Sequence, residues 1–104
     1  MPELKTATIQ AFQQYVKQLE VERGFDHQTV IEKCLLLGEE VGELFKAVRK
    51  TENIKIDHNS KKHEVGNELA DILIYLCAIA NRYNIDLETA FREKEEINKK
   101  RKWE

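Results

Sequence analysis

The sequence predicts an all-α protein: a four-helix chain that forms an oligomeric helical bundle with an antiparallel acidic helix hairpin. Apolar residues recur at spacings of three and four along most of the chain, which is the period of a helix. One proline and four glycines are too few for a fold rich in β-turns, and 41% of the residues are hydrophobic. With 104 residues, we expect a single domain over residues 1–104 that gains further burial by self-association.

The first two helices are predicted from apolar spacing and from signals at their ends. The first covers about Thr6–Glu22 and is stopped by Gly24. The second begins between Asp26 and Thr29, where the sequence has the form of a capping box, and reaches about Lys50. The apolar positions of the first helix are Ile9, Phe12, Val16 and Leu19. Those of the second are Val30, Cys34, Leu37, Val41, Leu44 and Val48.

A polar loop and two more helices follow. The loop is predicted over Thr51–Ser60, and either Asn59 or Ser60 caps the third helix. Asn84 ends that helix because asparagine tolerates the left-handed conformation, and Asp86 caps a fourth helix that reaches about residue 102. The apolar positions of the third helix are Val65, Leu69, Ile72, Leu76, Ile79 and Tyr83.

Charge and cysteine content exclude several classes of protein. The formal net charge is −2, so no overall positive field would attract a nucleic acid polymer. The longest apolar run is far shorter than the ~20 residues that cross a bilayer, and the first residues lack the apolar core of a signal peptide. Cys34 and Cys77 lie in apolar stretches without metal or redox spacing, which favours buried, reduced thiols. We therefore expect a cytoplasmic protein that does not bind membranes.

Two pairs of acidic residues flank the apolar positions of the second and third helices. Glu40 with Glu43, and Glu68 with Asp71, are three residues apart and therefore neighbours on a helix surface. The predicted loop lies midway between the pairs, so an antiparallel hairpin would bring them to the same height. Four carboxylates this close need a counter-charge, and Mg²⁺ or Mn²⁺ is the hard cation that oxygen ligands suit. The alternative is an acidic surface that is simply solvated.

Three glycines and three polar residues add to this hypothesis. Gly38, Gly42 and Gly66 lie inside predicted helices, where each costs ~1 kcal/mol relative to alanine. They suggest that a ligand or another helix approaches closely, although tight packing without a ligand is an equal alternative. The apolar stripe of the fourth helix continues as Lys94, Asn98 and Arg101. Such residues could face phosphates, or they could form a solvated basic end.

The acidic segments resemble a known enzyme family. Residues 37–47, LGEEVGELFKA, and residues 66–73, GNELADIL, are similar to the E-E-x-x-E … E-x-x-D signature of MazG-type nucleoside triphosphate pyrophosphohydrolases. The resemblance extends to Arg23–Asp26 and to the K-x-x-x-N-x-x-R run that ends at Arg101, and it covers roughly residues 9–103. It implies an all-α, Mg²⁺-dependent enzyme that removes aberrant or excess nucleotides. Such an enzyme hydrolyses a nucleoside triphosphate, often a deoxynucleotide, to the monophosphate and pyrophosphate. The resemblance also implies at least a dimer, and a tetramer is equally open.

The resemblance assigns roles residue by residue. Glu39 matches the first glutamate of the signature and is the candidate to orient or deprotonate water. The positions that match metal ligands are Glu40, Glu43, Glu68 and Asp71. The positions that match a phosphate- or nucleotide-contacting segment are Lys94, Asn98 and Arg101. The aromatic residues that could stack on a base are Phe12, Tyr15 and Trp103, although a core role is the alternative for the first two and an oligomer contact for the third.

A second functional hypothesis remains open at this level. The chain would then be a non-enzymatic helical interaction module, and its acidic hairpin would be surface that serves solubility alone. Removing charge from Glu40 and Asp71 separates the two hypotheses, because only an enzyme would lose metal binding and turnover.

Overall fold

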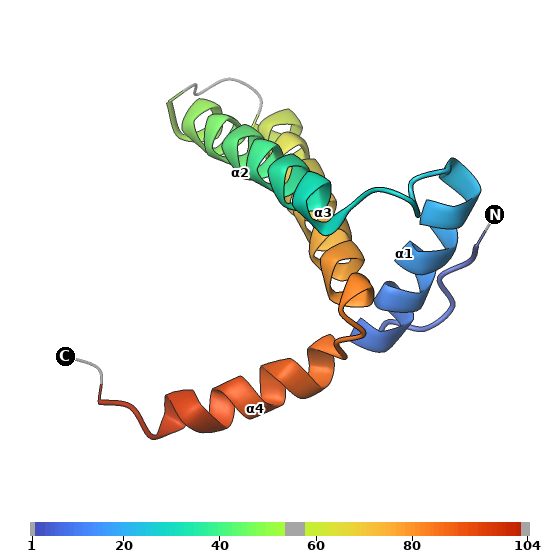
Figure 1. Ribbon diagram of the computed structural model, residues 1–104. Coiled ribbons are helices and arrows are strands. Elements are labelled where there is room, and N and C mark those ends of the chain that lie inside the picture. Colours follow the sequence, from blue (N-terminus) through green and yellow to red (C-terminus); the bar gives the residue numbers. More distant parts are fainter. Residues whose placement is uncertain (1, 54–57, 103–104) are drawn as a thin grey trace.

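The computed structural model describes residues 2–53 and 58–102, apart from the side chains of residues 53 and 58–63. These residues form four helices and no strand (Figure 1). The helices are α1 (Ile9–Arg23), α2 (Val30–Asn53), α3 (His58–Arg82) and α4 (Leu87–Lys99). The prediction of an all-α chain with four helices is confirmed for the described residues.

Local signals set several helix ends, as predicted. Gly24 ends α1 in the left-handed conformation with φ 75°, and Asn84 follows α3 with φ 54°. At the start of α2 the Glu32 amide donates to Thr29 Oγ1 at 3.1 Å, and the Thr29 amide donates to Glu32 Oε1 at 3.4 Å. This reciprocal pair is a capping box. The Asp86 side chain accepts from the first amides of α4 and caps that helix.

The predicted loop Thr51–Ser60 is wrong in its extent. Helix α2 continues to Asn53, and α3 already begins at His58. Asn59 and Ser60 therefore lie inside α3 and do not cap it. Once a helix has formed, each further residue adds a backbone hydrogen bond, so polar residues with moderate propensity extend it where no glycine or proline intervenes.

The start of α1 and the end of α4 also differ from the prediction by a few residues. Helix α1 begins at Ile9 instead of near Thr6, because Thr8 is its cap and accepts a hydrogen bond from the Ala11 amide at 3.0 Å. Helix α4 ends at Lys99 instead of near residue 102. Among the described residues, no helix has both the length and the apolar character to cross a bilayer.

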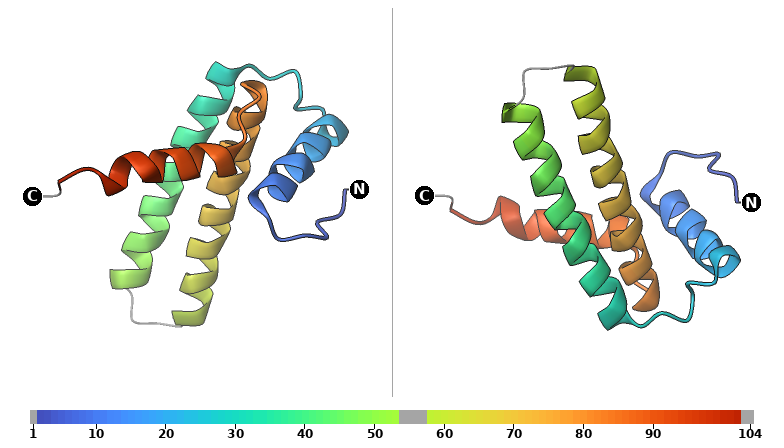
Figure 2. Two further views of the ribbon diagram at one scale, coloured as in Figure 1. Left: turned by 90° about the horizontal axis from the view of Figure 1, so that it is seen from below. Right: turned by 90° about the horizontal axis from the view of Figure 1, so that it is seen from above.

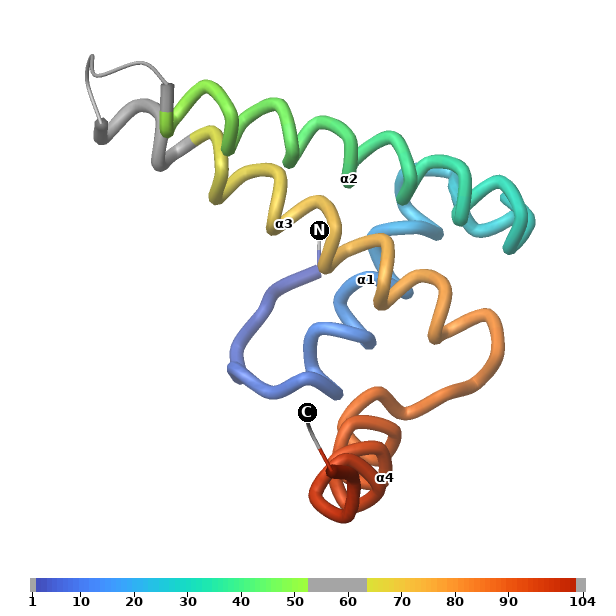
Figure 3. Tube along the Cα trace, turned by 90° about the vertical axis from the view of Figure 1, so that its left-hand side faces the viewer, coloured from blue at the N-terminus to red at the C-terminus, as the bar shows by residue number. Residues whose placement is uncertain are grey.

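The helices form a long pair with two shorter helices at one end. Helices α2 and α3 lie side by side, with the C-terminal end of α2 next to the N-terminal end of α3 (Figures 2 and 3). Helix α1 packs against the C-terminal half of α3, and α4 packs against α1 and projects away from the pair. Gln13 of α1 holds the start of α4, since its side chain donates to the Ile85 carbonyl at 2.7 Å and accepts from the Leu87 amide at 2.9 Å.

The buried core is small and lies where α1 meets α3. It consists of Val16, Leu19, Cys77 and Ala78. Phe12, Tyr15, Ile74 and Leu87 pack against this cluster. Phe12 and Tyr15 thus have the core position that the sequence left open as an alternative. Cys77 is buried as predicted, whereas Cys34 is exposed, which contradicts the prediction that both thiols are buried.

The apolar positions of α2 and α3 are only partly covered within one chain. Several of the positions predicted to be packed are exposed, namely Cys34, Val48, Leu69, Leu76 and Tyr83. Ile31, Leu35, Phe45 and Leu73 are exposed as well. The physical reason is geometric: α1 packs against one end of the long pair, and a two-helix pair has more apolar faces than the single contact between its members can bury.

Candidate functional site

Three carboxylates from α2 and α3 meet at one place. Glu40 of α2 and Glu68 and Asp71 of α3 each offer one oxygen, and these oxygens all lie within 4.8 Å of one another. Glu40 and Glu68 are partly buried, and Asp71 is exposed. Glu68 and Asp71 reach the same place because residues three apart share a helix face. We call these three residues the acidic cluster.

Neighbouring carboxylates disfavour the charged form of Glu40. The pKa of Glu40 is raised from 4.5 to about 7, first by a hydrogen bond with Glu68, then by burial, and then by the charges of Asp71, Glu68 and Glu43. Glu40 therefore keeps its proton up to near neutral pH. Glu68 Oε2 is buried without a hydrogen-bond partner among the described residues. Such an oxygen needs a partner, and a cation would supply one.

Glu43 and Glu39 lie at the edge of the acidic cluster. Glu43 is outside the group of three oxygens, but its charge contributes to the raised pKa of Glu40. It lines a shallow pocket of about 200 Å³ together with Glu68 and Lys46. Glu39 is exposed, and its charge contributes to a raised pKa of Tyr75. Glu43 thus acts electrostatically on the acidic cluster itself, and Glu39 acts on the neighbouring Tyr75.

A second pocket, of about 170 Å³, opens beside the acidic cluster. Glu40 and Asp71 line it together with Phe25, Lys33 and Tyr75. Burial raises the pKa of Tyr75, and the charges of Glu40, Asp71 and Glu39 raise it further, so Tyr75 lies within electrostatic reach of the acidic cluster. The remaining lining residues are Leu19, Glu20, Arg23, Ile74 and Ala78.

Sequence reasoning missed Phe25, Lys33 and Tyr75 as lining residues. The signal that could have found two of them is helical spacing. Lys33 is seven residues before Glu40, and Tyr75 is four residues after Asp71, so each shares a helix face with a member of the acidic cluster. Phe25 lies in the connection between helices and gives no such signal.

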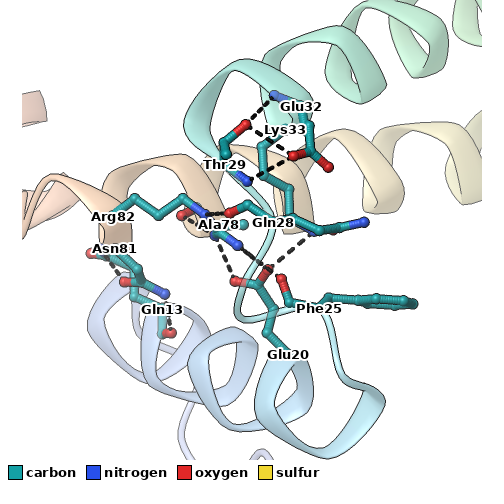
Figure 4. Close-up of polar contacts among 10 residues, drawn as sticks. All are labelled: Gln13, Glu20, Phe25, Gln28, Thr29, Glu32, Lys33, Ala78, Asn81 and Arg82. Carbon is teal, nitrogen blue, oxygen red and sulfur yellow. Dashed lines mark hydrogen bonds and ion pairs between the residues drawn. The ribbon is translucent and has the colours of Figure 1, made fainter.

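A buried ion network that includes Glu20 and Lys33 borders this pocket. Glu20 of α1 accepts two hydrogen bonds from Arg82 at 2.9 and 2.8 Å, and its carboxylate lies 3.1 Å from Lys33 Nζ (Figure 4). The side chains of Glu20 and Lys33 are 6% and 4% exposed. Burial alone would raise the pKa of Glu20, but the bonds from Arg82 and Lys33 outweigh burial and lower it. Glu20 is thus a carboxylate held in its charged form by two cations.

The residues predicted to contact phosphate are not brought to the acidic cluster within one chain. Lys94 and Asn98 lie on α4, which projects away from α2 and α3, and Arg101 follows its end (Figure 1). The Asn98 side chain donates instead to Glu95 Oε1 at 3.0 Å. Trp103 lies outside the described residues.

The predicted close approach to Gly38, Gly42 and Gly66 is not made within the described chain. A Cβ atom added at any of these glycines would meet nothing within 4 Å. Helix α3 therefore does not require glycine at the two positions on α2, and α2 does not require it at Gly66. No helix of the same chain makes the close approach that these glycines suggest, and an approach by a ligand or by a helix of a second copy stays a prediction.

A comparison with protein-family models identifies the segment that contains this site. Residues 25–102 match the model of the MazG nucleotide pyrophosphohydrolase domain. A comparison with curated proteins found no match. The matched segment includes all three residues of the acidic cluster and also Phe25, Lys33 and Tyr75 of the adjoining pocket. Because the match covers most of the sequence, the chain belongs to the MazG nucleotide pyrophosphohydrolase family.

Proposed function

We propose that this protein is a Mg²⁺-dependent hydrolase that converts nucleoside triphosphates, with deoxynucleotides preferred, to the monophosphate and pyrophosphate. The observation that carries the proposal is the acidic cluster: carboxylates of two helices with oxygens within 4.8 Å of one another, inside the segment that matches the family. In a cell the reaction would remove aberrant or excess nucleotides from the cytoplasmic pool.

The donor set of the acidic cluster suits a hard divalent cation. Glu40, Glu68 and Asp71 offer only carboxylate oxygens, and one buried oxygen of Glu68 has no described partner. We propose these three residues as ligands of Mg²⁺, with Glu43 as a fourth at the edge and Mn²⁺ as a possible substitute. A bound cation would offset the charge of the triphosphate, polarise the attacked phosphorus and stabilise the leaving pyrophosphate.

The other roles belong to side chains around the acidic cluster. Glu39, exposed next to Glu40, is proposed to orient the attacking water and accept its proton. No covalent nucleophile is needed for this reaction. The base would be held by aromatic residues, and the adjoining pocket provides Phe25 and Tyr75, whereas Phe12 and Tyr15 pack against the core.

We propose that the active form is a homo-oligomer, a dimer or a tetramer. Helix α4 projects away from the acidic cluster of its own chain, so Lys94, Asn98 and Arg101 would contact phosphates only in the site of a second copy. The uncovered apolar side chains of α2 and α3 provide a surface for that association. Light scattering would measure the mass of the oligomer. Mixing one variant inactive in the acidic cluster with another inactive in α4 should restore activity if the two parts of a site come from different copies.

The activity is tested with a panel of canonical and modified NTPs and dNTPs in Mg²⁺, scored for pyrophosphate against orthophosphate release. The double variant Glu40→Gln/Asp71→Asn should lose about a hundredfold or more of the turnover, because two oxygen charges of the acidic cluster are removed. Glu96→Gln, an acid-to-amide change in an exposed ion pair with Lys99, is the matched control and should keep full activity.

Two outcomes would contradict the proposal. Release of orthophosphate alone would show that a different bond is cleaved. Unchanged turnover in the double variant would show that the acidic cluster is not the site. If no triphosphate in the panel is hydrolysed by the wild type, the hypothesis of a non-enzymatic interaction module takes its place.

A further inference from the structure

Arg82, the last residue of α3, has every donor of its guanidinium in use. Nε donates to the Gln28 carbonyl at 2.9 Å, and Nη1 donates to Glu20 Oε1 and to the Ala78 carbonyl, both at 2.9 Å. Nη2 donates to Glu20 Oε2 at 2.8 Å and to the Phe25 carbonyl at 3.1 Å. A guanidinium has five N–H groups, so all of them have an acceptor.

These bonds tie three parts of the chain together. Glu20 belongs to α1, Ala78 to α3, and the carbonyls of Phe25 and Gln28 belong to the connection that leads into α2 (Figure 4). Two of the acceptors are backbone carbonyls in this connection, where the Phe25 amide also donates to the Glu20 carbonyl at 2.7 Å and the Gln28 amide to the Phe25 carbonyl at 3.1 Å. Lysine, with three donors on one atom, cannot reproduce a planar fork of this kind.

The tethered segment forms part of the pocket beside the acidic cluster. The Phe25 ring lies 5.2 Å from Lys33 Nζ, and both residues line the pocket together with Glu40 and Asp71. Lys33 is in turn held by Glu20, the residue that Arg82 clamps with two bonds. Arg82 itself does not line the described part of the pocket. It contacts the two wall residues only through the Phe25 carbonyl and through Glu20.

We propose that Arg82 is a positioning residue for the reaction: it fixes the connection at Phe25–Gln28 so that Phe25 and Lys33 form a rigid wall against the substrate bound at the acidic cluster. This inference rests on the proposed function. A wall that is already in place costs no ordering when the substrate binds, so its loss weakens binding and leaves the chemical step at the acidic cluster unchanged.

The test is Arg82→Lys, which keeps the charge next to Glu20 and removes the fork. We expect the KM for the triphosphate to rise about tenfold while kcat changes by less than about twofold, the signature of lost binding that is equal in ground and transition states. The matched control is Arg92→Lys, the same change in an exposed ion pair with Glu88, for which both constants should stay at wild-type values.

A double-mutant cycle shows whether Arg82 acts through the wall. Phe25→Leu removes the ring and should raise KM severalfold by itself. In that background Arg82→Lys should raise KM by less than about threefold, because residues that act through one another are not additive. Where Arg82→Lys does not fold, Phe25→Leu alone decides, since an unchanged KM would show that this wall does not meet the substrate.

Three results would overturn the inference. A variant Arg82→Lys that lowers kcat at unchanged KM has lost only folded enzyme, which is what a purely structural role predicts. An equal rise of KM in both backgrounds would show that Arg82 acts by another route. Wild-type KM in the folded variant would show that it has no role in the site. The proposed function fails separately, when the wild type itself releases no pyrophosphate.

Discussion

Two groups of charged side chains border one pocket and differ in how their charge is balanced. In the ion network, Glu20 has two cationic partners, and Arg82 has an acceptor for each N–H. In the acidic cluster, Glu40 is bonded to Glu68 and faces the like charges of Asp71 and Glu43. The charges of the first group are balanced among the described residues, and for the second group we propose a bound cation.

This difference separates structural from functional charge in the same small protein. A buried ion pair with all partners present is costly to break, because removing one partner leaves the other without compensation. A cluster of like charges is strained until a cation arrives, and it becomes more stable when a charge is deleted. Substitutions in the two groups should therefore change stability with opposite signs.

The largest expected effect comes from breaking the ion network. Glu20→Gln should lower the free energy of unfolding by about 3–5 kcal/mol, because Lys33 and Arg82 are left as neighbouring buried cations. Denaturation in urea measures the change. Glu88→Gln, which breaks the exposed pair with Arg92, is the control and should cost under about 1 kcal/mol. A loss for Glu20→Gln as small as that of the control would contradict the assignment of a structural role.

The second effect is stabilisation of the fold by a divalent cation bound at the acidic cluster. Mg²⁺ or Mn²⁺ at a hundred times its dissociation constant should raise the free energy of unfolding by about 2.7 kcal/mol, since only the folded chain presents the three carboxylates together. Thermal unfolding with and without the metal measures this. Glu68→Gln should remove most of the increase, while Glu96→Gln keeps it. An equal increase in all three proteins would place the metal elsewhere.

A smaller effect concerns pH in the absence of metal. The folded-state pKa of Glu40 is raised from 4.5 to about 7, so the folded chain binds this proton more tightly than the unfolded chain does. The contribution of Glu40 to stability should be fully present below the unfolded pKa and decrease, by about 1–2 kcal/mol after solvent screening, as the pH rises through about 7. Thermal unfolding in EDTA between about pH 5 and 8 tests the sign. Glu40→Gln should flatten the curve, and a wild-type protein that gains stability over this range would refute it.

The smallest expected change in stability comes from a substitution at Gly42, which lies on α2 near the acidic cluster. Since an added Cβ meets nothing within 4 Å, Gly42→Ala should raise the free energy of unfolding by about 1 kcal/mol. If substrate or a second copy approaches this glycine, turnover falls although stability rises. A loss of stability in the isolated chain would mean that the helix needs glycine at this position.

Sequence reasoning was most accurate where the signal is local. Gly24, Asn84 and Asp86 act on adjacent backbone groups, and the Thr29–Glu32 capping box closes within four residues. The spacing argument for two helices flanking a central loop also placed acidic residues of both helices at one height. Three of those four carboxylates meet in the structure, and their function as metal ligands stays a prediction.

Sequence reasoning failed where a residue's role depends on distant partners. Glu20 follows Val16 by four residues and so lies on the apolar face of α1, but a charged residue is normally assigned to solvent. Its partners lie 13 and 62 residues further along the chain, at Lys33 and Arg82, and no periodicity reports such pairings. The prediction that Cys34 and Leu69 are packed was wrong for a related reason, because periodicity identifies an apolar face without saying what covers it.

The single amide of Gln13 determines the bearing of α4. It bonds the chain on both sides of the junction, at Ile85 and Leu87, and is itself 7% exposed. Helix α4 has 13 residues and is therefore about 20 Å long. A tilt of about 10° at the junction would displace its far end by about 3.5 Å, more than the length of a hydrogen bond. The position of the C-terminal end of α4 therefore depends on Gln13, a neutral side chain at the opposite end of this helix.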